Sequence, residues 1–469
     1  MSVNSSVPSY LECAKPNPAA NRAPWYKNTA PTYAGIFLWY VFWGQAIAAG
    51  GNPGGILAAG VPVALGSLLV AALLCHFCFY YLPAMFGKRT GLPLFIVGTS
   101  TFGAVGGFML PGLLMGLLQF GWLAVNTYFS AGLLNEMFKF GDFGRYMIMV
   151  VWAVAGVVTA LKGIQYVAKF ATYLPIVPVI VLIWMIAKTA GGLGSFDAAD
   201  FASASALGDG KAAVGSMFVL CAVLAYVVGF FATAGAAGVD FGTGSRDKKD
   251  VAMGGLVGVS LAIFLTIGAA ILIVAGFYGS EEGKLMIASG TATLDPLALM
   301  PKILGSETVS NWVMFALALT AFPSVCFCSL IAANSIKNTF PKINPWISCG
   351  VGCAAALVLA ITGIAGNCGA VFGFIGASFG PICGAITMEY ILCKGRWSGP
   401  RAGFNPAGWV AWAVGFAVGV QPNFAAQCGF SIPAAPVMAY IVGAVIYAAL
   451  SKMQSKVLPY PQADEQTAD

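Results

Sequence analysis

Roughly a dozen apolar stretches, each about 20 residues long, run through almost the whole of this 469-residue chain. Short polar segments, many of them basic, separate these stretches. A helix of about 20 apolar residues is long enough to cross the ~30 Å hydrocarbon core of a bilayer. The pattern therefore predicts an all-α polytopic membrane protein with about 12 transmembrane helices. The predicted spans are residues 33–57, 60–84, 100–134, 145–161, 165–189, 213–240, 251–278, 308–335, 346–366, 369–393, 405–421 and 433–452.

The composition supports this class and excludes a soluble domain. Hydrophobic residues make up 59% of the chain and charged residues only 9%, whereas about 25% of the residues in ordinary globular proteins are charged. The net charge of +6 comes from basic residues scattered between the spans, so it does not indicate a nucleic-acid partner. The expected class is a transporter or channel, whose partners are the lipid bilayer and a small-molecule substrate.

No catalytic arrangement is evident within the spans. They contain no Ser–His pair, no paired carboxylates and no group of histidines, so no enzyme activity is expected. His76 is the only histidine, and it stands between Cys75 and Cys78 with a spacing that is typical of metal sites. No second pair of ligands lies nearby in the sequence, so we expect no cofactor other than a possible Na⁺ as coupling ion.

Both ends of the chain are predicted to be disordered and cytoplasmic. Residues 1–30 and 456–469 are polar and lack apolar periodicity, and residues 31–455 form the predicted transporter domain. If the N-terminus is cytoplasmic, 17 of the 23 Lys and Arg residues fall on the cytoplasmic side, as the positive-inside rule requires. We expect a multi-pass protein of the inner or plasma membrane that works as a monomer.

Glycine-rich interruptions mark the first and sixth spans. The first contains Gly44 and the run 50–55 (GGNPGG), and the sixth contains Gly229, Gly235 and Gly238. Helices broken at matching places in two halves of a chain indicate an inverted-repeat transporter, because unpaired backbone groups must line a cavity. The alternative is that these glycines serve close helix packing, since the chain has 59 of them.

The polar residues at membrane depth are mostly neutral. Asp240 and Glu389 are the only acidic residues in the spans, and each lies near the inner end of its helix. A carboxylate at the bilayer centre is costly, and no chain of carboxylates is available here for a proton pump. Gln119 and Trp122, by contrast, are three residues apart and share a helix face.

An amide beside an indole suits a flat heterocyclic ligand. The indole face can stack on the ring, and the carboxamide can bind its polar edge. Phe230 and Phe231, in the glycine-rich part of the sixth span, could form the opposite wall. Aromatic residues in membrane helices also pack or anchor at interfaces without binding a ligand, and that alternative stays open.

Several segments resemble the cytosine permease branch of the nucleobase–cation symporter-1 family, over roughly residues 30–450. They are Gly87-Lys88-Arg89-Thr90-Gly91-Leu92 with Thr101-Phe102-Gly103, Gln119-x-Gly121-Trp122, Val227-Val228-Gly229-Phe230-Phe231 continuing to Asp240-Phe241, and Phe374-Ile375-Gly376-Ala377-x-Phe379-Gly380-Pro381. The resemblance implies a LeuT-type five-plus-five inverted repeat with broken first and sixth helices. The repeats would cover about residues 31–189 and 211–393, and two extra helices about 405–452. It also implies import of a nucleobase-like ring with sodium or a proton.

The resemblance also assigns candidate site residues. Trp122 would stack on the substrate, Gln119 would lie near its edge, and the sixth helix would line the pocket. The full candidate substrate set is Trp122, Gln119, Gly229, Phe230, Phe231, Gln45 and Cys326. The implied sodium site lies between the first and eighth helices, and its candidates are the carbonyls of Trp39, Phe42 and Ala321 with the Ser324 hydroxyl.

The chain departs from the family pattern in the eighth helix. Pro323-Ser324 stands where cytosine permeases have a Thr-Thr pair, and thiols at Cys326 and Cys328 replace an Asn-rich patch. One hydroxyl fewer weakens the expected sodium site. Because a buried hydrogen bond left unmade costs about 1–3 kcal/mol, cytosine itself is not the expected ligand.

The leading hypothesis is secondary active uptake of a nucleobase or related planar heterocycle by alternating access. A second hypothesis keeps the fold but exchanges the ligand for an amino acid or a vitamin precursor. A third is a ligand-binding sensor or uniporter without ion coupling, which the missing hydroxyl favours.

Overall fold

The computed structural model describes residues 8–12, 14–30, 43–44, 47, 54–171, 173–174, 176–204 and 215–460. Within these residues, eight helices are long and apolar enough to cross a bilayer. Two shorter apolar helices, α19 (Pro345–Ile361) and α23 (Ala435–Ala449), and the helix α21 (Pro406–Val420) complete the C-terminal half. With the first predicted span, most of which lies outside the described residues, this arrangement agrees with about twelve transmembrane helices.

The eight long spans are Val61–Thr90, Phe108–Phe138, Gly141–Gly163, Ile176–Ser195, Ser216–Ala236, Lys248–Tyr278, Glu307–Thr339 and Cys368–Leu392. They are built from α4 (Val61–Leu74), the π-helical segment η5 (Cys75–Tyr81), α5 (Leu82–Thr90), the π-helical segment η6 (Phe108–Leu113), α8 (Leu114–Phe138), α9 (Gly141–Ala171), α10 (Ile176–Thr189), η7 (Ala190–Ser195), α12 (Ser216–Ala236), α14 (Lys248–Gly255), the π-helical segment η9 (Leu256–Leu261), α15 (Ala262–Tyr278), α18 (Glu307–Thr339) and α20 (Cys368–Leu392). The short helices are α1 (Ser9–Glu12), α6 (Leu94–Val97), α7 (Thr99–Phe102), α11 (Ala198–Ser203), α13 (Gly238–Thr243), α16 (Glu281–Ala288), α17 (Pro296–Leu304) and α22 (Ala425–Cys428).

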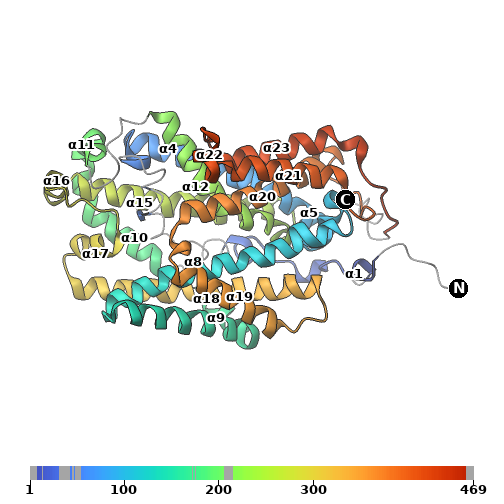
Figure 1. The fold of residues 1–469 in the computed structure, drawn as a ribbon, viewed down its shortest axis with the longest axis horizontal. Coiled ribbons are helices and arrows are strands. Elements are labelled where there is room, and N and C mark those ends of the chain that lie inside the picture. The colour runs from blue at the N-terminus through green and yellow to red at the C-terminus, as the bar shows by residue number, and fades with distance from the viewer. Residues whose placement is uncertain are drawn as a thin grey trace.

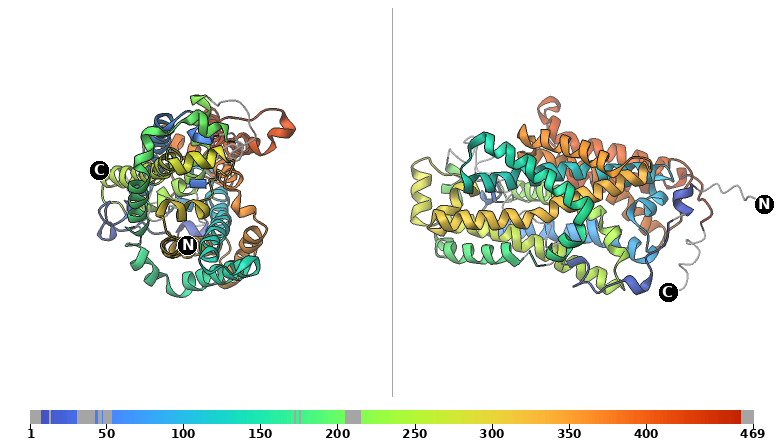
Figure 2. Two further views of the ribbon diagram at one scale, coloured as in Figure 1. Left: turned by 90° about the vertical axis from the view of Figure 1, so that its left-hand side faces the viewer. Right: turned by 90° about the horizontal axis from the view of Figure 1, so that it is seen from below.

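Most helices run along the long axis of the molecule and form two packed groups (Figures 1 and 2). In Figure 1, α8, α9, α18 and α19 lie along the lower side, and α12, α20, α21 and α23 lie along the upper side. The contacts agree, because α8 packs against α18, α9 and α19, while α20 packs against α12, α21 and α23. The interface between α8, α12 and α20 therefore joins the two groups.

Small residues let these helices approach closely, as is usual where lipid provides no hydrophobic drive for association. A Cβ atom on Gly116 of α8 would lie 2.8 Å from the Ser335 side chain of α18. One on Gly376 of α20 would lie 2.7 Å from Pro436 of α23. At such positions a larger side chain would push the two helices apart.

The N-terminal segment and the last described residues lie at the same end of the molecule, and α11, α16 and α17 lie at the other (Figure 1). The Tyr460 hydroxyl donates to the Leu11 carbonyl at 3.0 Å, which joins the two ends of the chain directly. This arrangement is consistent with both termini on one side of the membrane. The end that carries the termini is called the inner end below.

Residues 14–30 and 456–460, which are predicted to be disordered, form hydrogen bonds to other parts of the chain. The N–H groups of Asn17 and Ala23 donate to the carbonyls of Gly91 and Gly244, each at 2.9 Å. Leu458 donates in the same way to Pro400 at 2.7 Å. These partners are loops far away in the sequence, so the polar composition of the segments gave no sign of them.

A buried carboxylate ties the inner ends of several helices together. Glu389 of α20 accepts hydrogen bonds from the hydroxyls of Ser398 at 2.6 Å and Tyr447 of α23 at 2.8 Å. Arg401 lies 3.5 Å from the same carboxylate and donates through Nε to the Ser100 carbonyl of α7 at 2.9 Å. We call these five residues the inner hub. It anchors α20, α23 and α7 to one another.

The sixth helix is interrupted at Ala237, between the predicted Gly235 and Gly238. α12 runs without interruption through Gly229 and Gly235, and a turn at Ala237 separates it from α13. Both glycines serve close packing instead, because a Cβ atom on Gly229 would lie 2.6 Å from the Phe372 carbonyl oxygen of α20. In the first predicted span, Gly54 adopts a left-handed conformation with φ 75°, and most of the remainder lies outside the described residues.

The predicted boundary between the fourth and fifth spans, at residues 161–165, coincides with an interruption of α9. Gly163 has non-helical dihedral angles (φ −140°, ψ 19°), and the fourth span ends there. The second part of α9 ends at Ala171, and α10 begins at Ile176.

Candidate functional site

Four aromatic side chains meet where α8, α12 and α20 come together. Trp122 lies near the midpoint of the span Phe108–Phe138. Its ring centroid is 4.9 Å from that of Phe230 and 5.3 Å from that of Phe372. Phe230 and Phe372 are 5.2 Å apart, and Tyr226 extends the group at 5.0 Å from Phe372. We call these four residues the aromatic cluster, and all of them are buried.

Hydrogen bonds fix the indole of Trp122 within the bundle. Its Nε1–H donates to the Thr233 hydroxyl of α12 at 3.0 Å, and the Asn126 amide donates to its main-chain carbonyl at 2.9 Å. A buried indole N–H without a partner would be costly. Thr233 therefore holds the indole towards α12, and Trp122 faces protein rather than lipid.

Gln119 lies one helical turn from Trp122, on the inner side, and is also buried. Its Nε2 donates to the Met115 sulfur at 3.5 Å, and a thioether is only a weak acceptor. Its Oε1 has no hydrogen-bond partner among the described residues. The carboxamide can therefore give up its weak hydrogen bond to Met115 and form a stronger one with the polar edge of a ligand.

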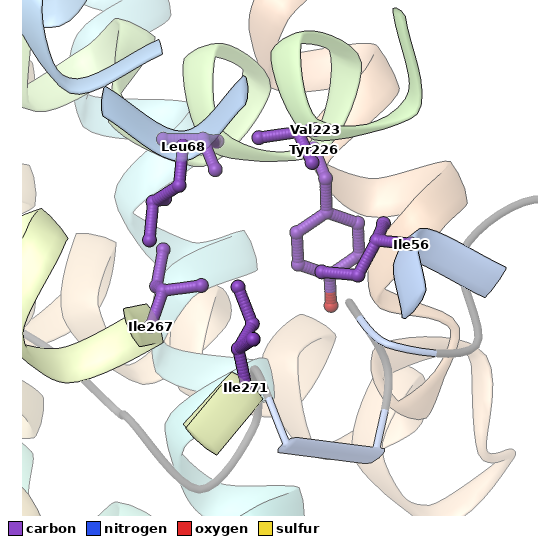
Figure 3. Close-up of a pocket in the computed structure, with 7 residues that line it drawn as sticks. Ile56, Leu68, Val223, Tyr226, Ile267 and Ile271 are labelled. Carbon is purple, nitrogen blue, oxygen red and sulfur yellow. The ribbon is translucent and has the colours of Figure 1, made fainter. Parts of the chain in front are cut away.

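A small apolar cavity borders the cluster on the side of Tyr226 (Figure 3). Ile56, Leu68, Ile267 and Ile271 form most of its wall, and the Tyr226 ring extends between Ile56 and Ile271. Its volume is about 10 Å³, which is enough for about one water molecule. A heterocycle would therefore fit only after the rings of the cluster separate.

The remaining candidates on the sixth and eighth helices differ in position. Phe231 is buried on α12, and Gly229 packs directly against Phe372 of the aromatic cluster. The structure does not bring Cys326 to the cluster, because it is fully buried against Ala160 of α9. We therefore leave Cys326 out of the proposed site.

The eighth-helix candidates for the cation site share one face of α18. Ala321 is buried and Ser324 half-buried, three residues apart, near the midpoint of the span Glu307–Thr339. The other predicted contributors to the cation site, Trp39 and Phe42, lie outside the described residues, as does the substrate-site candidate Gln45. Among the described residues, no three His, Cys, Asp or Glu side chains come together as metal ligands.

Sequence reasoning did not assign Phe372, Thr233 or Tyr226 to the site. Phe372 lies just before the tenth-helix segment that was compared with the family, and Thr233 follows the Phe230-Phe231 pair. The spacing of Tyr226 and Phe230, four residues apart, is a signal for one shared helix face. No comparable signal connects Phe372 to Trp122, because they lie on different helices.

Known proteins support the same architecture. A family model described as "Permease for cytosine/purines, uracil, thiamine, allantoin" matches residues 39–445. No curated protein matches the chain by sequence. Among solved structures, the inward-facing conformation of Mhp1 has a TM-score of 0.68 and 16% identity, covering 100% of this chain and 99% of that one.

Two further structures show the fold in other states. Mhp1, a nucleobase-cation-symport-1 family transporter, in a closed conformation with bromovinylhydantoin bound gives a TM-score of 0.65 at 16% identity, covering 96% of this chain and 97% of that one. A substrate-bound, outward-open Na⁺-coupled sialic acid symporter gives 0.61 at 13% identity, covering 96% and 95%.

The helix arrangement and these likenesses define a multi-pass membrane transporter with the LeuT-type five-plus-five fold, and not an enzyme. The match over most of its length places the chain more specifically. It belongs to the family of permeases for cytosine/purines, uracil, thiamine and allantoin.

Proposed function

We propose that this permease carries a nucleobase or a related planar heterocycle across the membrane by alternating access, coupled to sodium or a proton. The observation that carries the proposal is the aromatic cluster, in which a hydrogen-bonded indole meets two phenylalanine rings at mid-span. The family to which the chain belongs transports ligands of this class. The bromovinylhydantoin bound to Mhp1 is another planar ring.

In the proposed binding step, the rings of Trp122, Phe230 and Phe372 separate and receive the ligand between them. Stacking of a base on an aromatic side chain is worth about 1–3 kcal/mol. Thr233 keeps the indole in one orientation through its hydrogen bond, so little further ordering is needed on binding. Gln119 would then donate to and accept from the polar edge of the ring.

The coupling ion would bind on the face of α18 that carries Ala321 and Ser324. Carbonyl and hydroxyl oxygens at mid-membrane are ligands that sodium accepts in transporters of this type. The Na⁺ coupling of the sialic acid symporter, which shares the fold, supports this part of the proposal. With one hydroxyl fewer than cytosine permeases, the site would bind sodium weakly, and a proton is the alternative.

The orientation and assembly of the protein are also proposals. The inner end carries both ends of the chain and most of the basic loops, so we place it in the cytoplasm. The plasma or inner membrane is the proposed location, and a single chain the proposed transport unit. No nucleic-acid contact is part of this proposal.

A second candidate retains the fold but changes the ligand to a vitamin precursor or an amino acid. The family description includes thiamine as well as nucleobases. The two candidates differ in their dependence on stacking. A flat ring needs the indole face of Trp122, whereas an aliphatic zwitterion does not.

Uptake into proteoliposomes tests the proposal. Purified protein would be offered radiolabelled uracil, cytosine, hypoxanthine, allantoin, thiamine and alanine, with and without a sodium or pH gradient. We expect uptake of at least one planar ring, accelerated by one of the gradients. Uptake of alanine alone, or of none of the compounds, would refute the proposal.

A further inference from the structure

A second cavity lies at the inner end, between η6, α13 and α18. Its volume is about 50 Å³, against about 10 Å³ for the apolar cavity beside Tyr226, and it is partly open to solution. The chemistry-bearing residues in its wall are Phe95, Phe108, Met115, Asp240, Ser335 and Asn338. Asp240 is the only ionisable side chain in this wall. The cavity thus combines a carboxylate, an amide and a hydroxyl with two aromatic rings.

The Asp240 carboxylate uses one of its two oxygens in a hydrogen bond within the protein. Its Oδ1 accepts a hydrogen bond from the Leu94 N–H at 2.8 Å, while Oδ2 has no partner among the described residues. The Asp240 side chain is exposed at the edge of the cavity. Its carboxylate oxygens are acceptors for N–H donors.

Other residues of the cavity wall offer ring contacts and hydrogen-bond donors to a planar ligand. Phe95 and Phe108 lie 5.7 Å apart with their rings nearly perpendicular. Tyr10 already packs against Phe108 at 3.8 Å, so Phe95 is the main candidate for a ring contact. Ser335 and Asn338 lie three residues apart on α18, on the same face as Ser324. Their hydroxyl and amide can donate to a ring carbonyl, which a carboxylate cannot do.

The cavity lies directly on the inner side of the aromatic cluster. Met115 forms part of its wall, and the same Met115 sulfur accepts the hydrogen bond from Gln119. Gln119 is in turn one helical turn from Trp122. A ligand that moves inwards past Gln119 therefore arrives in this cavity before it reaches the cytoplasm.

We propose that the inner cavity is a second, weaker binding site for the same planar heterocycle, in which Asp240 accepts ring N–H groups and Asn338 or Ser335 donates to a ring carbonyl. The ligand occupies this site after it leaves the aromatic cluster. This inference rests on the proposed function, because it takes the same ligand class. It goes beyond that function because it assigns a second binding site, formed by different residues, on the side where the ligand is released.

Equilibrium dialysis with radiolabelled uracil, cytosine, hypoxanthine and allantoin tests this inference on the purified full-length chain. The variants are Asp240→Asn, Asn338→Ala and the matched control Asn334→Ala. Asp240→Asn keeps an oxygen for the Leu94 N–H but removes the negative charge. Asn334 is exposed on the same helix, one turn away, and is not part of the cavity wall.

We expect wild-type protein and Asn334→Ala to bind the ligand with a strong and a weak component. Asp240→Asn and Asn338→Ala should weaken the weak component by roughly tenfold or more and leave the strong component unchanged. A single component in the wild type, or equal effects of Asn338→Ala and Asn334→Ala, would overturn the inner site alone. If the wild type binds none of the four compounds, the proposed function fails and the inner site fails with it.

Discussion

The aromatic cluster and the inner hub are both buried, yet they are held together by different forces. In the cluster, one side-chain hydrogen bond, from Trp122 to Thr233, accompanies ring contacts between α8, α12 and α20. In the hub, a single carboxylate receives two hydroxyl groups and a guanidinium. Ring contacts contribute about 0.5–1.5 kcal/mol each beyond burial, whereas opening a buried charge pair costs several times more.

The comparison suggests which part of the molecule moves. The hub fixes the inner ends of α20 and α23 to α7, so these segments should move as one body. The rings of the cluster can separate without leaving a charge unpaired. The following substitutions test this difference, from the largest expected effect to the smallest.

Arg401→Met should be the most damaging change, because it leaves the Glu389 carboxylate buried without its cation. Loss of one partner of a buried pair typically costs about 3–5 kcal/mol. We expect a large fall in the melting temperature of the purified protein. Arg396→Met is the matched control, since Arg396 is exposed in the same loop. Equal melting temperatures for the two variants would show that the hub is not a strong anchor.

Gly229→Ala should have the next largest effect, through the packing of α12 on α20. The added methyl group would lie 2.6 Å from the Phe372 carbonyl oxygen, and overpacking of this kind costs about 1–3 kcal/mol. Thermal unfolding would measure the loss. Gly121→Ala is the control, because a Cβ atom there has no neighbour within 4 Å. If Gly229→Ala were as stable as Gly121→Ala, close approach would not explain this glycine.

Thr233→Val should produce a smaller loss of stability but a clear loss of ligand affinity. The substitution keeps the shape and removes the acceptor of the Trp122 N–H. Side-chain hydrogen bonds in membrane proteins average about 0.6 kcal/mol, and the unpaired indole N–H adds to this cost, so the melting temperature should fall, but by less than in Gly229→Ala. The apparent KM for uptake should rise several-fold because the indole is no longer fixed. Thr266→Val, whose hydroxyl bonds only within its own helix, should leave KM unchanged. A similar KM for both variants would contradict the proposed role of Thr233.

Lys302→Ala should have the smallest effect on stability. Lys302 pairs with Glu282 at 3.2 Å on the outer end, and both side chains are about half exposed. Exposed pairs contribute less than about 1 kcal/mol. A melting temperature within experimental error of the wild type is expected. A loss as large as that of Arg401→Met would remove the distinction between buried and exposed charge pairs.

Much of the fold could be predicted because a bilayer demands long apolar helices, and apolar length is read directly from sequence. The exact position of the interruption in the sixth helix could not be predicted, because the sequence does not distinguish a glycine that breaks a helix from one that packs against a neighbouring helix. Gly229 and Gly235 belong to the second kind. The hydrogen bonds of residues 14–30 could not be predicted either, because they go to loops far away in the sequence.

Only the part of the candidate site that lies within one helix could be predicted from the spacing of residues in the sequence. Gln119 and Trp122 share a helix face, and the family resemblance identified their segment. Phe372 and Thr233 contact the indole of Trp122 from other helices. No local sequence pattern predicts a contact between two helices. Cys326 was selected by its place in the sequence, although its face of α18 packs against α9.

Ligand binding by Trp122 variants tests the central claim most directly. Dialysis would compare wild type, Trp122→Phe, Trp122→Ala and the control Trp152→Ala, which removes an indole on α9 that contacts Phe322 instead. Loss of a stacking partner worth about 1–3 kcal/mol predicts roughly 5- to 150-fold weaker binding of a planar heterocycle by Trp122→Ala. Trp122→Phe should retain most of the affinity, and Trp152→Ala all of it. Unchanged binding by Trp122→Ala would contradict the account.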